Sequence, residues 1–340
     1  MSASGLPFDD IRALCHMLPP PDSEAMAAVR ERNASLAMPA GGLGRLEEIM
    51  VWLAGWQGTA QPRVTRPLVA VFAGNHGVAA QGVSPYPQGL TAEMMANFAA
   101  GGAAINQICA TFDIGLKVFE LGLPYPTGDI TRTVAMEEKD CAATMAFGME
   151  AVAGGTDLLC LGEAGVGNTT VAAALLAALH GGSGADWVGA GSGADAAGVA
   201  RKIAAVDAAL ALHRPHASDP LEILRRLGGR ELAAIAGAIL AARLQRIPVI
   251  LDGFVVTAAA SVLHALDSSA LDHCIAGHVS AEQGHARALA SLGLKPVLDL
   301  GIGLGEGAGA ALAAGIVRAA AACHADMATA GQAGMSGKLN

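Results

Sequence analysis

One carboxylate in this chain stands between glycines, in the string GLGEGAGAAL (residues 303–312). This residue, Glu306, follows a short apolar run and precedes an alanine-rich stretch, which places it at a predicted strand-to-helix turn. A glutamate in the first turn of a helix can simply oppose the helix dipole. Capping does not require the flanking glycines, however, and these would leave the carboxylate bare beside a flat ligand. The string therefore fits either a cap or a general base in a partly apolar pocket.

Two further glycine-rich turns could bind an anion. In GEAGVGNTT (162–170), Gly165 and Gly167 would let a ligand approach the backbone, and the residues that follow are typical of helix N-caps. Free N–H groups at a helix N-terminus attract phosphate or carboxylate, although this turn lacks the lysine of a Walker A loop. The turn GAGSGAD (189–195) repeats the pattern. Lys202 could add a point charge there, but its spacing alone favours an ordinary surface lysine.

A long polar loop contains GNHGV (74–78) and GVSPYPQGLT (82–91). Loops of this kind at strand ends commonly carry binding residues. Tyr86 lies between two prolines and could stack on a planar heterocycle. His76 could be catalytic, but a histidine that bonds a backbone carbonyl is more common.

A short segment is crowded with possible metal ligands, namely His273, Cys274, His278, Glu282 and His285. No HExxH or CxxC spacing is present, and the run CIAG within the segment is typical of a strand. We therefore expect no metal site, and expect the segment to offer Ser280 and backbone groups to a ligand.

These strings share a place in the chain, because each follows a short run that is apolar throughout. Such runs occupy residues 68–74, 114–122, 156–162, 185–191, 247–253, 272–278 and 295–301. Runs without alternation predict strands buried on both faces, and their alternation with helical stretches predicts parallel pairing. We expect an α/β fold with a doubly wound, mostly parallel sheet in three layers. Its ligand site should lie beyond the carboxyl ends of the strands.

The organisation of the chain follows from the same pattern. Residues 1–65 are helical and polar in character, and prolines at 19–21 break them into segments. We expect residues 66–305 to form the α/β domain. The segments 1–65 and 306–340 should pack together as a smaller helical domain.

Composition excludes several classes of protein. The 340 residues include 21 basic and 30 acidic ones, and a net charge of −9 argues against nucleic-acid binding. The mean hydropathy of +0.44 raises the question of a membrane, but the longest uncharged stretches, 94–112 and 164–185, contain Asn and several Gly. The string MSASGLPFDDIRAL is acidic where a signal peptide is basic. Six cysteines without a CxxC pair are expected to be free thiols. These features favour a cytoplasmic protein without a membrane or nucleic-acid partner.

Taken together, the strings resemble those of the nicotinate-nucleotide–dimethylbenzimidazole phosphoribosyltransferase family of cobalamin biosynthesis. The strings GNHGV, GVSPYPQ, GEAGVGNTT, GAGSGAD with a following ARK, DGF, AGHVSAEQGH and GLGEGAGAAL occur in the family's order. The resemblance implies a doubly wound domain that binds phosphoribosyl and benzimidazole groups, a small helical domain and a homodimer. It implies transfer of phosphoribose from nicotinate mononucleotide to 5,6-dimethylbenzimidazole, which gives nicotinate and α-ribazole 5′-phosphate. The transfer is a single displacement with inversion and uses no metal or redox cofactor.

The resemblance also implies roles for individual residues. The family's general base falls on Glu306. Its substrate contacts fall on Glu163, Gly165, Gly191, Lys202, Gly253, Ser280 and Leu304, and, for the benzimidazole, on Ser84, Tyr86 and Gln88. Asn75 stands where many family members have Asp, and since an amide cannot act as a base, we expect a structural role for it.

Two other classes stay open on the residues alone. A dinucleotide-dependent oxidoreductase would explain the glycine-rich strand ends, but it requires GxGxxG after the first strand, which GNHGV does not match. A non-catalytic nucleotide-binding protein could use the anion turns but would not need Glu306. The Glu306→Gln variant separates these cases, because only an enzyme has turnover to lose. The residues leave open whether benzimidazole, adenine or a phenol is the preferred acceptor.

Overall fold

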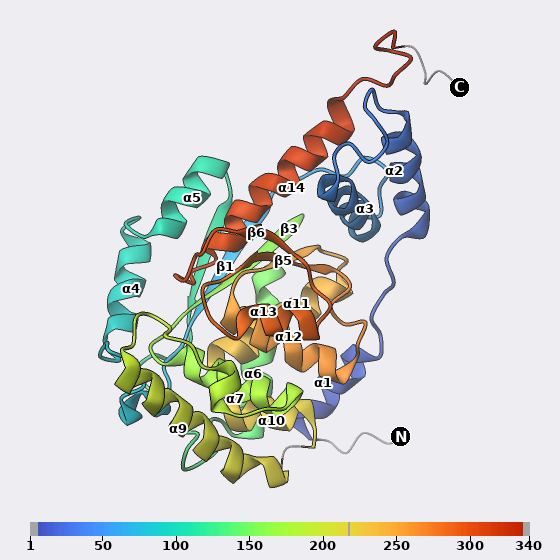
Figure 1. Ribbon diagram of the computed structural model, residues 1–340. Coiled ribbons are helices and arrows are strands. Elements are labelled where there is room, and N and C mark those ends of the chain that lie inside the picture. The colour runs from blue at the N-terminus through green and yellow to red at the C-terminus, as the bar shows by residue number, and fades with distance from the viewer. Residues whose placement is uncertain (1–5, 217, 336–340) are drawn as a thin grey trace.

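The structure is a computed structural model that describes residues 6–216 and 218–335. Within these residues a six-stranded parallel sheet has the order β2-β1-β3-β4-β5-β6 (Figure 1). The chain passes from β1 to the edge strand β2, returns to β3 and continues outward to β6. The winding therefore reverses between β1 and β3, which confirms the predicted doubly wound sheet. The strands are β1 (Pro67–Ala73), β2 (Gly115–Glu120), β3 (Leu158–Ala164), β4 (Val249–Leu251), β5 (Cys274–Val279) and β6 (Pro296–Asp299).

Helices cover both faces of the sheet, as the absence of alternation in the strands predicts. Along β3, Leu159 and Leu161 belong to one hydrophobic core, and Leu158 and Cys160 belong to a second core on the opposite face. The first core lies under α1 (Pro7–Cys15), α6 (Glu138–Met149), α7 (Asn168–His180), α9 (Ala196–His213), α10 (Pro220–Leu227), α11 (Arg230–Leu244) and α12 (Phe254–Leu266). The second lies under α2 (Ser23–Ser35), α3 (Arg45–Gln57), α5 (Ala104–Phe112) and α14 (Ala308–Asp326).

Short helices complete the chain between these layers. The α-helices α4 (Leu90–Ala99), α8 (Gly184–Trp187) and α13 (His285–Ser291) lie in the connections that follow β1, β3 and β5. The 3₁₀ turns are η1 (Gly77–Gln81), η2 (Glu150–Val152) and η3 (Arg214–His216). Since the connections after the strands run past the carboxyl edge of the sheet, they supply the walls of the site described below.

One of the seven predicted strands, residues 185–191, is wrong, because its first part lies in the single helical turn α8 and the rest is irregular. The side chain of Asp186 accepts hydrogen bonds from both the backbone N–H and the hydroxyl of Ser183, each at 2.8 Å, which caps the turn. Trp187 is fully buried by neighbouring helices. The apolar run in this segment therefore reports burial against helices rather than in the sheet.

The helices α2, α3 and α14 pack against one another at one end of the molecule (Figure 1). Helix α1, in contrast, packs against α6 on the other face of the sheet. The division of the chain at residues 65 and 305 stays a prediction, and its ends, 1–5 and 336–340, lie outside the described residues.

Helix α14 is, within the described ranges, the one helix long and apolar enough to cross a membrane. Just over half of that span, 56%, is buried inside the molecule, where the helix packs against β3 and β5. The six cysteines are free, as predicted, and five of them are buried.

Candidate active site

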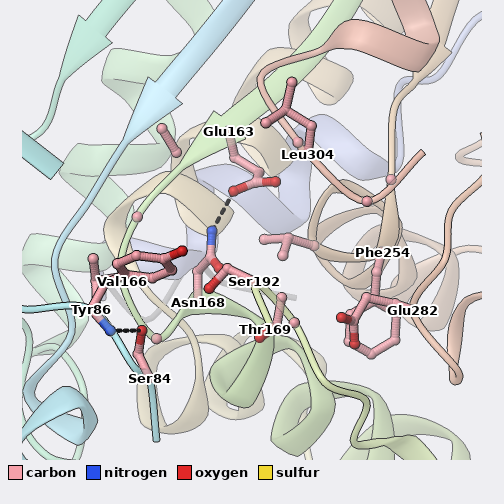
Figure 2. A pocket seen from close by; sticks show the side chains of 18 of the residues that line it. Ser84, Tyr86, Glu163, Val166, Asn168, Thr169, Ser192, Phe254, Glu282 and Leu304 are labelled. Carbon is pink, nitrogen blue, oxygen red and sulfur yellow. Dashed lines mark hydrogen bonds between the residues drawn. The ribbon is translucent and has the colours of Figure 1, made fainter. Parts of the chain in front are cut away.

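A cavity of about 470 Å³ opens at the carboxyl ends of β3, β4 and β5, where the fold predicts a ligand site. Its walls come from the turns after these strands, the loop after β1 and the segment before α14 (Figure 2). The predicted site residues that line it are Ser84, Tyr86, Glu163, Gly165, Gly191, Lys202, Gly253, Ser280 and Leu304. Two predicted residues, Gln88 and Glu306, lie outside this lining.

Glu163 is the penultimate residue of β3 and reaches into the cavity (Figure 2). One oxygen of its carboxylate accepts a hydrogen bond from the side-chain amide of Asn168, at the start of α7. Burial, followed by the charges of Asp252, Glu231 and Glu306, raises the pKa of Glu163 to about 8, and the Asn168 hydrogen bond opposes the shift. A group with this pKa can hold or release a proton near neutral pH.

The two glycines of the turn after β3, Gly165 and Gly167, have different structural reasons. Gly165 is packed against the loop that follows β1. A Cβ atom on Gly165 would lie 2.4 Å from the carbonyl oxygen of Gly74, so the turn excludes any larger residue there. Gly167 has a φ of +89° and begins α7, a conformation that favours glycine. The first glycine therefore permits close contact between two loops, and the second presents the N–H groups of α7 to the cavity.

Lys202 is buried, with 2% of its surface exposed, so the surface position favoured by its spacing is wrong. Its ammonium group donates hydrogen bonds to the carbonyl of Gly189 at 2.8 Å and to the hydroxyl of Thr169 at 3.0 Å. Burial lowers the pKa of Lys202, and the nearby charge of Glu282 opposes the shift. The ammonium lies directly under Gly191, whose Cβ would stand 2.9 Å from it. The cavity thus has one buried cationic group beside its glycine-rich turns.

Glu306 occupies a turn of unusual backbone conformation next to the cavity. Gly305, Glu306 and Gly307 all have positive φ, at +79°, +64° and +82°, which is uncommon for a glutamate. The backbone N–H of Glu306 donates to the carbonyl of Glu163 at 3.0 Å. Burial raises the pKa of its carboxyl group, the backbone N–H of Ile105 in α5 lowers it, and Asp252 raises it. The carboxylate therefore lies near α5 and not in the cavity wall.

Asp252 holds this turn in place and was missed by sequence reasoning. It follows β4 directly, and its two carboxylate oxygens accept hydrogen bonds from the N–H groups of Gly307 at 3.1 Å and Ala310 at 2.9 Å. It caps the start of α14 from another strand, and His278 lies 3.5 Å from it. Asp252 could have been predicted from its position, because it is a polar residue directly after a buried strand, as is the predicted site residue Ser280.

The loop after β1 places Ser84 and Tyr86 at the mouth of the cavity. The hydroxyl of Ser84 accepts a hydrogen bond from the backbone N–H of Tyr86 at 3.1 Å. The Tyr86 ring is 48% exposed, which leaves it free to contact a ligand. Gln88 instead donates to the carbonyl of His76 at 2.8 Å and so braces the loop from behind.

Asn75 is buried and has the structural role that was predicted for it. Its amide donates to the carbonyl of Leu123 at 3.1 Å and accepts from the hydroxyl of Thr91 at 2.7 Å. The same hydroxyl accepts from the N–H of Val166 at 3.3 Å. Asn75 therefore ties together the loop after β1, the start of α4 and the turn after β3.

His76 was expected to bond a backbone carbonyl, but its side chain faces a carboxylate instead. Its Nε2 lies 2.7 Å from Oε1 of Glu231, and both side chains are fully buried. The pair lies under Gly74 and Gly229, where added Cβ atoms would stand 2.4 Å from Glu231 and from His76 respectively. Glu231 was missed, because a glutamate in the first turn of α11 looks like an ordinary helix-dipole partner.

The segment crowded with possible metal ligands places its side chains in separate contacts. Across the described parts of the chain, no three His, Cys, Asp or Glu side chains are grouped so as to hold a metal ion. His273 lies 3.0 Å from the carbonyl of Ile239 beneath the sheet, whereas Glu282 lines the cavity. Ser280 lines it too, as predicted.

The cavity therefore has two chemically different parts. Around Lys202 and the glycine turns, N–H groups and an ammonium favour an anion such as a phosphate. Around Tyr86, apolar walls from Leu90, Met94 and Leu304 suit a planar ring. Glu163 is an ionisable group in the lining itself. Glu306 lies behind the lining, directly after the lining residue Gly305.

Comparison with known proteins places these features in a family. A family model described as "Phosphoribosyltransferase" (DBI_PRT) matches residues 18–335. A curated protein from Sinorhizobium, named nicotinate-nucleotide–dimethylbenzimidazole phosphoribosyltransferase, is 66% identical over 338 residues, which cover 99% of this chain and 100% of the relative. A protein of the same name from Rhizobium rhizogenes is equally similar over the same shares of both chains.

Solved structures agree with the sequence relatives. A crystal structure from Thermus thermophilus, titled as the nicotinate-nucleotide–dimethylbenzimidazole enzyme, superposes with a TM-score of 0.87 at 40% identity. A second, titled CobT from the same organism, gives 0.88 at 42% identity. Each match covers 93% of this chain and 100% of the solved one.

Proposed function

The chain belongs to the nicotinate-nucleotide–dimethylbenzimidazole phosphoribosyltransferase family, and on that premise we propose how its cavity carries out the transfer. Phosphoribose moves from nicotinate mononucleotide to 5,6-dimethylbenzimidazole, which leaves nicotinate and α-ribazole 5′-phosphate. The observation that carries the proposal is the union, in one cavity, of a buried ammonium, two glycine-rich anion turns and an apolar mouth, with a bare carboxylate behind the wall.

We place the phosphate of the nucleotide among the N–H groups of α7 and the turn that contains Gly191. Lys202 lies under that turn and supplies the positive charge. Gly253 and Ser280 bound the same side of the cavity. Because Lys202 is held by two hydrogen bonds before any ligand arrives, it needs little ordering on binding.

The benzimidazole occupies the mouth, against Tyr86 and Leu304 with Ser84 beside them. Tyr86 offers a flat, half-exposed ring, and stacking on a planar heterocycle would cover it. Gln88 acts on this ring indirectly, since its hydrogen bond to His76 holds the loop.

Glu306 is the general base in this proposal. The attacking nitrogen of the benzimidazole forms the new bond to the anomeric carbon while the bond to the nicotinate nitrogen breaks. Nicotinate departs as a neutral pyridine ring, so it needs no acid, but the benzimidazole N–H must lose its proton, which passes to a carboxylate. Glu306 directly follows Gly305, which lines the cavity, and we propose that its side chain turns away from Ile105 to accept the proton of the bound ring.

Glu163 has a different part in the same step. It lies in the wall beside the glycine turn, where the anomeric carbon develops positive charge as nicotinate leaves. The free protein holds Glu163 mainly protonated at neutral pH, but the positive charge of the bound pyridinium nucleotide favours its ionised form. That carboxylate stabilises the developing charge, and its contact with Asn168 fixes its direction. The two carboxylates thus act on different atoms, one on the acceptor's proton and one on the sugar.

The proposed reaction is tested by following nicotinate release from nicotinate mononucleotide with and without 5,6-dimethylbenzimidazole. Release that requires the acceptor, with α-ribazole 5′-phosphate formed in equal amount, supports single displacement. Release without the acceptor would point to a hydrolase, and no release under either condition would overturn the substrate pair.

We also propose that the chain works as a cytoplasmic homodimer without a membrane or nucleic-acid partner. The support is the family resemblance, together with the excess of acidic over basic residues. Light scattering on the purified chain should give twice its 33.9 kDa mass. A monomeric mass would overturn the dimer and leave the transfer reaction untouched.

A further inference from the structure

His285 is a fully buried side chain that connects two neighbouring segments of the cavity lining. Its Nδ1 lies 2.8 Å from the backbone nitrogen of Ser280, and its Nε2 lies 2.9 Å from the hydroxyl oxygen of Thr257. That hydroxyl donates in turn to the carbonyl oxygen of Gly253 at 2.9 Å. Ser280 and Gly253 both line the cavity on the same side. A continuous chain of hydrogen bonds therefore runs from one segment to the other through one imidazole ring.

The hydrogen bonds assign one tautomer to this ring. A backbone N–H only donates, so Nδ1 must accept from Ser280 and carries no proton. The hydroxyl of Thr257 gives its proton to Gly253, so its oxygen accepts the proton on Nε2. Burial, with a smaller effect of the neighbouring His278, lowers the pKa of His285 to about 3, so the ring is neutral at working pH.

The pairing of the sheet does not reach these two segments. Pairing between β4 and β5 runs from Val249 opposite Cys274 to Leu251 opposite Ala276. Gly253 and Ser280 both come after these residues, on segments that lead into different helices. Beyond the pairing, His278 lies 3.5 Å from Asp252, and the bridge through His285 and Thr257 adds hydrogen bonds that reach the backbones of Gly253 and Ser280.

The surroundings of His285 keep the ring from moving. It begins α13, and a Cβ on the preceding residue, Gly284, would lie 2.7 Å from the carbonyl oxygen of Trp187 and 3.0 Å from the ring of Phe254. The Phe254 ring also meets the imidazole edge to face, with the ring centres 6.4 Å apart. The start of α13 is therefore closely packed, and the hydrogen bond from Ser280 to His285 holds the Ser280 backbone against it.

Resting on the proposed function, we propose that His285 is a positioning residue for the donor nucleotide. As the Nε2–H tautomer it fixes the Ser280 and Gly253 backbones relative to one another, on the side of the cavity against which the phosphoribose is bound, and it does not touch substrate. Misplacement of a reacting group by about 1 Å can cost roughly 100-fold in rate, so a bridge of this kind matters without any contact to the ligand.

A pair of variants breaks the same hydrogen bond from its two ends. Thr257→Val keeps the shape of the side chain and removes the hydroxyl. His285→Asn offers an oxygen where Nδ1 stood, so it can still accept from Ser280, but it does not reach Thr257. Each variant should raise the KM for nicotinate mononucleotide by about 10-fold and leave the KM for the benzimidazole unchanged, and the double variant should be no worse than either single one.

The matched control is Thr257→Ser, which keeps the hydroxyl and should restore the wild-type KM for the nucleotide. Losses that multiply to about 100-fold in the double variant would overturn the proposal, because independent sites add in free energy. So would equal changes in both KM values, or an activity loss that only follows the folded fraction seen by circular dichroism.

A readout that needs no activity separates this proposal from the function on which it rests. In ¹⁵N NMR of histidine-labelled protein, the signal that disappears in His285→Asn should show a protonated Nε2 and a bare Nδ1 throughout neutral pH. The Thr257→Val variant should shift that Nε2 signal. A Nδ1–H tautomer or a charged ring would overturn the bridge, even in an active enzyme. An inactive wild-type chain with the expected signal would instead overturn only the proposed reaction.

Discussion

Two carboxylates stand at neighbouring turns of this molecule and differ in almost every respect that matters for chemistry. Glu163 is the penultimate residue of a fully buried strand, lines the cavity and is held by an amide. Glu306 lies two residues before helix α14, has left-handed backbone between two glycines and lies behind the wall near α5. The backbones of the two turns are joined by a hydrogen bond of 3.0 Å from Glu306 to Glu163.

The difference shows that position in the cavity wall does not by itself identify a base. Burial raises the pKa of both groups, and each accepts a hydrogen bond, Glu163 from Asn168 and Glu306 from the backbone N–H of Ile105. The second oxygen of Glu306, however, has no hydrogen-bond partner among the described atoms. A carboxylate with such an oxygen can accept a proton, and a carboxylate in the wall can stabilise charge that develops beside it. The predictions below test this division of roles.

The largest effect is expected for Glu306→Gln, which keeps the shape of the side chain and removes its basicity. Loss of a general base typically costs about 10²- to 10⁴-fold, so kcat for benzimidazole-dependent nicotinate release should fall by that factor. The matched control is Glu93→Gln, an exposed carboxylate in α4, which should behave as wild type. Turnover equal to wild type in Glu306→Gln would assign the base elsewhere.

The next effect concerns Glu163 and the pH dependence of stability. Its folded pKa of about 8 lies above the ordinary value of 4.5, so the folded state holds a proton that the unfolded chain releases. Its contribution to stability is complete below the lower value and is lost as pH rises through the higher one. Glu163→Gln should therefore gain stability over wild type between these pH values, by at most roughly 5 kcal/mol at 1.36 kcal/mol per pKa unit.

Urea unfolding at several pH values measures this gain. Glu120→Gln, at the exposed end of the edge strand β2, is the matched control and should follow the wild-type curve. If Glu163→Gln runs parallel to wild type at every pH, the carboxyl group is ionised in the folded protein, and the contrast with Glu306 has to be redrawn.

A smaller effect is expected at Asp252, which connects the two turns through α14. Asp252→Ala removes the acceptor for the N–H groups of Gly307 and Ala310, and loss of a helix cap costs about 1 kcal/mol. Since Glu306 directly precedes Gly307, kcat should also fall by about 10-fold, as for a loosened catalytic group. Thermal unfolding and kinetics measure the two changes, with Asp299→Ala at the exposed end of β6 as control. A stability loss without a kinetic one would make Asp252 purely structural.

Much of the fold could be predicted because burial leaves a direct mark on sequence. Six apolar runs form strands, of which β1, β3, β4 and β5 are buried between helices as predicted, whereas the edge strands β2 and β6 are only partly buried. The run at 185–191 carries the same mark, yet Trp187 is buried by helix packing, and local capping by Asp186 decides its conformation. Apolarity reports burial, and it does not say against which element a segment is buried.

The site could be predicted where a residue's chemistry is local and was missed where a distant partner decides it. Glycine-rich turns at strand ends marked the cavity correctly. The role of Asp252 depends on Gly307, which is 55 residues later in the chain, and Glu231 depends on His76. Lys202 looked like a surface residue because nothing near it in sequence shows that Thr169 and Gly189 enclose its ammonium. Such partners become visible only in three dimensions.

The most direct test of the division between the two carboxylates measures binding and turnover in the same two variants. Calorimetric titration gives the Kd of nicotinate mononucleotide for Glu306→Gln and Glu163→Gln, and nicotinate release gives their kcat. The account predicts that Glu306→Gln binds the nucleotide as wild type does and loses turnover. Glu163→Gln should also keep its Kd, because the lost charge acts on the transition state, and should lose only part of its turnover. Wild-type turnover in Glu306→Gln, together with complete loss of turnover in Glu163→Gln, would contradict the account and exchange the two roles.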